Sequence, residues 1–110
     1  MRKTTQLFKA LADQNRLRIL LMLCEKELCV CEITEVIQLA PSTVSKHLSI
    51  LRNTDLIVDR KCGRWINYSL NPRIHNQLID FLQNELKSDS IYLSDITKIK
   101  TVDRHLLCNP

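Results

Sequence analysis

The 110-residue chain contains one glycine and three prolines, and it has no long uninterrupted apolar run. So few glycines and prolines leave little room for loops, which predicts a mostly helical fold. No segment reaches the roughly 18 consecutive apolar residues that span a bilayer, and the N-terminus lacks the apolar stretch of a signal peptide. We therefore expect a cytoplasmic protein with no membrane partner.

Motifs of small enzymes are also missing. The sequence has no CxxC motif beside a strand–helix unit, no glycine-rich phosphate loop and no paired carboxylates in a pocket-like context. The prediction is that the chain is not an enzyme.

Five cysteines are present: Cys24, Cys29, Cys31, Cys62 and Cys108. Thiols stay reduced in the cytoplasm and the number is odd, so metal ligands, redox sensors or buried apolar side chains are expected before a disulfide framework. Two of these thiols lie one residue apart in ELCVCEI, residues 27–33.

Positive charge is concentrated in the middle of the chain. The formal net charge is +4, and residues 41–64 hold five basic and two acidic side chains, whereas residues 65–110 are balanced. A concentrated positive field is the expected footprint of phosphate contacts. A solvated basic face would give the same pattern.

Apolar residues at helical spacing predict helices at residues 4–11, 14–23, 30–37 and 42–53. Asp13 is placed to cap the second helix, which should be the central core element. In the third helix, Glu32 and Glu35 should face outward. Pro41 suits the first turn of the fourth helix, and Ser42 should supply its capping oxygen. The buried stripe of this helix is expected to be Val44, Leu48 and Leu51.

The residue pattern changes from helical to β-rich after residue 55. Two β-rich runs flank Gly63, the only glycine, and predict a hairpin whose turn needs a positive φ. A helix should resume after Pro72, and one side of it carries more apolar surface than a solitary terminal helix needs: Ile74, Leu78, Phe81, Leu82 and Leu86. We expect this surface to form half of a dimer interface.

Two short helices followed by a hairpin predict a winged helix-turn-helix, a mainly α (α+β) fold with one two-stranded β-wing. We expect one domain over residues 1–110, with the helix-turn-helix at 30–53, the wing at 56–70 and a C-terminal dimerisation helix and tail at 73–110. The exposed face of the second short helix and the wing carry hydroxyls and cations that suit double-stranded DNA. The predicted DNA contacts are Ser42, Thr43, Ser45, Lys46, His47, Ser49, Arg60, Lys61 and Arg64.

Three basic or titratable side chains have a second interpretation. His47 borders the buried stripe, so a packing role is equally open. Arg16 and Arg18 are expected to be structural or solvated rather than bound to DNA.

Four stretches, ALADQNRLRILLML, ELCVCEI, PSTVSKHLSILR and GRWINYSL, resemble the ArsR/SmtB family of metal-responsive winged-helix repressors in order and spacing. The resemblance covers roughly residues 5–70. It implies a homodimer on operator DNA that is released when a toxic metal or metalloid binds. The likeness is greatest to the arsenic- and antimony-responsive ArsR type, which implies trivalent arsenic or antimony as inducer and Cys29 and Cys31 as thiolate ligands.

The spacing of these two cysteines restricts how they can share one ion. Residues two apart on a regular helix point about 200° away from each other. Cys29 and Cys31 can therefore share an ion only if the helix begins between them or if its first turn unwinds. The helix N-terminus should also favour the thiolates and lower their pKa.

The resemblance places a third cysteine where this chain has Thr34. Cys24 and Cys108 are then equal candidates for the third ligand, and a small external thiol or hydroxide is another. Cys62, on the wing, is expected to lie too far away.

Other signals stay open. The cadmium- or lead-responsive type of the family adds cysteines from an N-terminal extension, and this chain has none before Cys24. A zinc-type site is only hinted at by Asp103 and His105. A thiol-redox sensor of the same fold is a further alternative, and so is a pair of buried thiols without ligand function.

Overall fold

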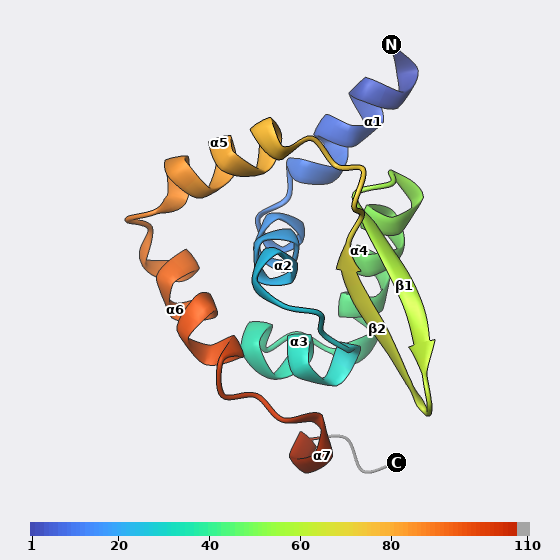
Figure 1. The fold of residues 1–110 in the computed structure, drawn as a ribbon, viewed down its shortest axis with the longest axis vertical. Coiled ribbons are helices and arrows are strands. Elements are labelled where there is room, and N and C mark those ends of the chain that lie inside the picture. Colours follow the sequence, from blue (N-terminus) through green and yellow to red (C-terminus); the bar gives the residue numbers. More distant parts are fainter. Residues whose placement is uncertain (108–110) are drawn as a thin grey trace.

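The computed structural model describes residues 1–107. Their elements, in chain order, are α1 (Arg2–Leu11), α2 (Gln14–Glu25), α3 (Val30–Ile37), α4 (Pro41–Asn53), β1 (Ile57–Cys62), β2 (Trp65–Leu70), α5 (Asn76–Leu86), α6 (Ser90–Ile99) and α7 (Arg104–Leu107) (Figure 1). This order of helices and hairpin is a winged helix-turn-helix, so the predicted fold class is confirmed.

The core is built around α2, which the other helices and the wing surround in Figure 1. Ile19, Leu20 and Met22 on this helix have no exposed surface. Burying a large apolar side chain contributes about 1.5–3 kcal/mol, so α2 anchors the fold, as its sequence predicts. Within residues 1–107, no helix is both long enough and apolar enough to cross a membrane.

The N-terminal ends of three helices test the capping predictions. The Asp13 carboxylate accepts hydrogen bonds from the backbone N–H groups of Asn15 (2.9 Å) and Arg16 (3.0 Å), which confirms this cap of α2. The third helix begins at Val30, as predicted. The prediction for Ser42 is wrong: α4 begins at Pro41 after an N-cap at Ala40, so Ser42 lies inside the first turn.

The wing is an antiparallel pair of β1 and β2, in register from Ile57 opposite Leu70 to Cys62 opposite Trp65. Gly63 lies at the turn with a φ of 60°, which confirms the reason for the glycine. The chain between α2 and α3 also pairs with the wing, since Leu28 forms a bridge with Tyr68. This extra bridge was not predicted.

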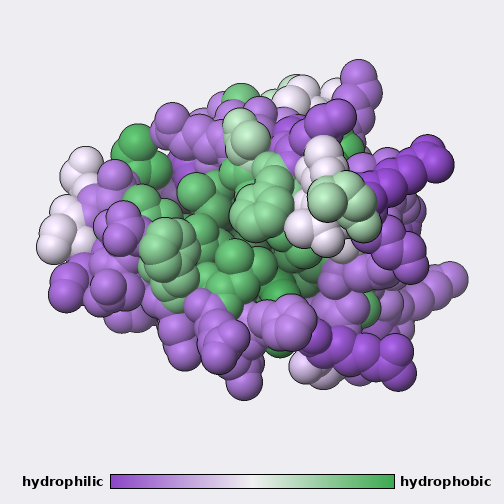
Figure 2. Space-filling view, turned by 90° about the horizontal axis from the view of Figure 1, so that it is seen from above, coloured by the Kyte–Doolittle hydropathy of each residue, from purple (hydrophilic) through white to green (hydrophobic). Residues whose placement is uncertain are grey.

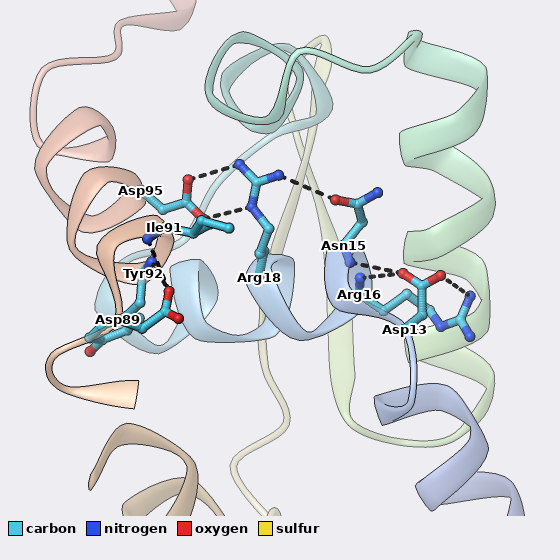
Figure 3. Close-up of polar contacts among 8 residues, drawn as sticks. All are labelled: Asp13, Asn15, Arg16, Arg18, Asp89, Ile91, Tyr92 and Asp95. Carbon is cyan, nitrogen blue, oxygen red and sulfur yellow. Dashed lines mark hydrogen bonds and ion pairs between the residues drawn. The ribbon is translucent and has the colours of Figure 1, made fainter. Parts of the chain in front are cut away.

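In the C-terminal third, the first helix begins later than predicted, and the chain then returns toward α2. α5 begins at Asn76, and α6 packs against α2. The Arg18 guanidinium forms two 2.9 Å hydrogen bonds with the buried Asp95 carboxylate of α6 (Figure 3). The prediction that Arg18 is structural is thus confirmed.

Candidate nucleic-acid interface and thiol site

The helix α4 has one buried face and one exposed face. Its predicted stripe of Val44, Leu48 and Leu51 is fully buried. The opposite face carries the exposed side chains that the sequence assigns to DNA on this helix: Ser42, Thr43, Ser45, Lys46 and Ser49. The stripe fixes α4 against the core, and the hydroxyls and the cation are left together on the surface.

His47 lies between the two faces and is half-buried. Its Nδ1 is 3.4 Å from Nη1 of Arg16, whose Nε donates a 2.7 Å hydrogen bond to the carbonyl oxygen of Ala10. Arg16 therefore ties the end of α1 to α4, which agrees with its predicted structural role. The contact gives His47 a packing role and leaves it at the edge of the exposed face of α4.

The three wing cations are exposed but differ in their partners. Arg60 donates a 2.8 Å hydrogen bond to the Glu27 carboxylate, and this bond lowers the pKa of Glu27. The Arg64 guanidinium lies 5.5 Å from the centre of the Trp65 ring. Lys61 and Arg64 at the hairpin turn are thus presented to solvent, whereas Arg60 is already engaged.

The third helix begins between the two closely spaced cysteines. Cys29 is the N-cap of α3, with a φ of −96° and a ψ of 171°, and Cys31 lies in the first turn. This is one of the two arrangements in which the pair can face one ion. Cys29 is only 2% exposed, and Cys31 is half-buried.

A capping box joins Cys29 to Glu32. The backbone N–H of Cys29 donates a 2.9 Å hydrogen bond to Oε1 of Glu32, and the Glu32 N–H faces the Cys29 side chain. The same Oε1 accepts a 3.0 Å hydrogen bond from Arg104. The outward orientation predicted for Glu32 is therefore wrong: the residue is 4% exposed. The Cys-x-x-Glu spacing of a capping box was the local signal for it.

Burial raises the pKa of two cysteine side chains, Cys29 and Cys24. It raises the pKa of Cys29, and the backbone N–H of Glu32 offsets this only in part. The predicted lowering of the pKa of Cys29 is wrong, because the burial of its side chain outweighs the effect of the helix N-terminus. Burial, followed by the nearby Glu25, raises the pKa of Cys24 to about 11.

The third ligand is not assembled in residues 1–107, where no three His, Cys, Asp or Glu side chains are grouped to hold a metal ion. Cys24 is thus not brought into a three-residue site with the pair, and Cys108 lies outside the described residues. Thr34 stands at the third-cysteine position, and its buried Oγ1 has no hydrogen-bond partner among the residues described. Cys62 is exposed on β1, part of the wing.

An apolar surface lies at the end of the molecule formed by α1 and α5. Figure 2 looks down on this end and shows a hollowed apolar patch ringed by hydrophilic side chains. Phe8 is 60% exposed and Phe81 59% exposed. A cleft of about 470 Å³ between the two helices is lined in part by Leu7, Phe8 and Leu78. Contiguous apolar patches of this kind mark interaction surfaces.

The winged helix-turn-helix fold, with hydroxyls and a cation on the exposed face of α4, defines a DNA-binding regulator. Comparison with known proteins narrows the class. Residues 13–58 match the model of the bacterial regulatory proteins of the arsR family. The arsenical resistance operon repressor of Bacillus subtilis is 44% identical over 72% of this chain and 76% of its own length. The chain belongs to the ArsR family of transcriptional regulators.

Other relatives extend the likeness. The arsenical resistance operon repressor of Escherichia coli is 47% identical over 63% of this chain, which spans 60% of that repressor. The solved structure of HlyU from Vibrio cholerae has a TM-score of 0.72 and 33% identity, covering 79% of this chain and 95% of HlyU. A homolog of a cadmium resistance regulatory protein, from Staphylococcus aureus, is also similar. The relatives are transcriptional regulators named for different signals.

Proposed function

We propose that this protein is a repressor of a metalloid-resistance operon, released from operator DNA when trivalent arsenic or antimony binds the thiolates of Cys29 and Cys31. The start of α3 between the two cysteines carries the proposal, because it frees Cys29 from helical geometry. The names of the Bacillus subtilis and Escherichia coli repressors support the choice of arsenic. Thiolate ligands also favour soft ions of this kind.

For DNA, we propose that the exposed face of α4 enters the major groove and that the wing cations contact the flanking backbone. Hydroxyls and Lys46 near the start of α4 suit base edges and phosphates. A homodimer through the apolar patch on α1 and α5 would present two such helices to half-sites about 34 Å apart. A monomeric mass at micromolar concentration in sedimentation would contradict the dimer.

For the inducer, the Cys29 side chain must leave its buried place against the Glu32 N–H. As the As–S bond forms, the Cys29 thiol would give its proton to a hydroxide of arsenite, which leaves as water, so this step releases no net proton. The third ligand remains Cys24, Cys108, an external thiol or hydroxide. The loss of the cap at the start of α3 would loosen the helix that braces α4.

The test is fluorescence anisotropy of the reduced protein on the duplex upstream of its own gene, titrated with arsenite, cadmium and zinc. Arsenite should release the wild-type protein at near-stoichiometric amounts. C29S and C31S should bind DNA but ignore arsenite, and C62S, the matched control on the wing, should respond as wild type does. Full arsenite response in both C29S and C31S would refute the site.

A second candidate, a cadmium- or lead-responsive repressor, is favoured by the similarity to the Staphylococcus aureus protein. Release by cadmium but not by arsenite would select it. A thiol-redox repressor would instead respond to peroxide and lose its response under strong reductant.

A further inference from the structure

The segment that carries the two cysteines, residues 27–32, is attached to the wing, and we call it the thiol segment. Leu28 exchanges two backbone hydrogen bonds with Tyr68 of β2, at 3.0 and 2.8 Å. The neighbouring Glu27 holds Arg60 of β1 through a 2.8 Å ion pair. The first residues of the thiol segment thus extend the wing by one bridge.

A second attachment runs through side chains at the other end of the thiol segment. Oε1 of Glu32 accepts hydrogen bonds from the Cys29 N–H and from Nη2 of Arg104. The Arg104 guanidinium in turn lies 5.3 Å from the centre of the ring of Trp65, the first residue of β2. The side chains of Glu32 and Arg104 are 6% and 17% exposed, so water screens this ion pair poorly.

These contacts form one path from the inducer thiol to the wing. The path begins at the capping box of Cys29, continues through Glu32 and Arg104, and ends at Trp65. A two-stranded hairpin is marginally stable by itself, so its orientation depends on such attachments. Cys29 contributes both its side chain and its backbone N–H to the capping box. A shift of its backbone out of this position must therefore shift or release the Glu32 carboxylate, to which Arg104 is bound.

We propose that Glu32 and Arg104 are positioning residues that set the wing according to the state of Cys29, so that the wing is a direct output of inducer binding. This inference rests on the proposed function. In the free protein, the bridge through Arg104 holds Trp65 and the wing in place. When Cys29 is drawn to the inducer, the bridge is disturbed and the exposed wing cations lose their register with DNA.

Trp65 is the single tryptophan of the chain and therefore reports on the wing. The experiment uses the full-length, reduced protein without DNA, titrated with arsenite. Bound arsenic is measured by equilibrium dialysis, and Trp65 emission is recorded in parallel. In the wild-type protein, emission should change and saturate together with binding.

Arg104→Gln removes the cation from Glu32 and from the ring. We expect arsenite affinity within about threefold of wild type and no change in Trp65 emission on binding. On DNA, the arsenite-dependent loss of affinity should fall from a typical allosteric range of roughly 5- to 150-fold to less than about threefold. Arg64→Gln is the matched control, because Arg64 also lies beside Trp65 but on the wing itself; its emission response should persist.

The outcomes of these experiments distinguish a failure of the wing inference from a failure of the proposed repressor function. If wild-type protein binds arsenite without an emission change, or if R104Q keeps the full emission response and full release from DNA, the wing inference is overturned and the proposed function stands. If wild-type protein binds no arsenite, the proposed function fails and the inference fails with it. Should circular dichroism show that R104Q is unfolded, Arg104→Lys takes its place: it keeps a cation for Glu32, loses the planar face over Trp65 and should lose the emission response.

Discussion

Arg18 of α2 and Asp95 of α6 form one ion pair, but replacing either residue should lower the free energy of unfolding by a different amount. Replacing Arg18 by Met leaves the Asp95 carboxylate, whose side chain is 4% exposed, without its cation. Breaking a buried pair in this way costs about 3–5 kcal/mol. Replacing Asp95 by Leu leaves a guanidinium that is 21% exposed and still bonded to Asn15 Oδ1 at 3.2 Å. That cation can turn to water, so about 1.5–3 kcal/mol is expected.

The assay is urea unfolding at pH 7 and one fixed protein concentration, followed by far-ultraviolet circular dichroism. The double variant R18M/D95L removes both charges and should recover most of the free energy of unfolding lost by R18M, since a well-packed apolar pair can replace a buried ion pair. A loss below about 1 kcal/mol in R18M would refute the reasoning, because it would mean that water screens the pair. Strictly additive losses in the double variant would refute it as well.

Two further predictions concern local groups. With a pKa of about 11, Cys24 is about 0.1% thiolate at pH 8, against roughly a quarter for an ordinary cysteine. Iodoacetamide should therefore label Cys24 about two orders of magnitude more slowly in the folded protein than in urea. Equal labelling rates, measured by mass spectrometry, would contradict this. Asp13→Ala should lower the free energy of unfolding by about 1 kcal/mol, and Asp13→Asn by less. The backbone N–H of Arg16 lowers the pKa of Asp13, so the Asp13 carboxylate stabilises the fold above about pH 4 and loses this effect in stronger acid. The difference in the free energy of unfolding between wild type and D13A should therefore shrink as the pH falls, and a difference that grows would contradict the prediction.

Elements with strong local signals were predictable from the sequence. The start of α3 at Val30, the cap at Asp13 and the turn at Gly63 each depend on a few neighbouring residues. The buried stripe of α4 follows from helical periodicity, and the exposed face that we assign to DNA is the opposite side of the helix. The failure at Ser42 is of the same local kind, since Pro41 set the first turn one residue earlier.

The burial of polar and titratable side chains and their long-range partners were not predictable. The charge of Glu32 predicts an exposed side chain, yet the residue is buried because Arg104, 72 residues further along the chain, forms a hydrogen bond with its carboxylate. Arg18 meets Asp95 across 77 residues. The same limit explains the wrong pKa direction for Cys29, because a helix N-terminus is visible in a sequence and a desolvated side chain is not.

Cysteine is a poor choice for the helix cap that Cys29 provides. Serine, threonine, aspartate and asparagine are the strongly preferred N-caps, because their oxygen accepts the backbone hydrogen bond better than sulfur does. Serine at position 29 should therefore keep α3 at least as stable while removing the proposed soft ligand. C29S thus separates two explanations of the residue: retained DNA affinity with lost inducer response supports a ligand, whereas weakened DNA binding without inducer would show that the thiol is needed for the shape of the thiol segment.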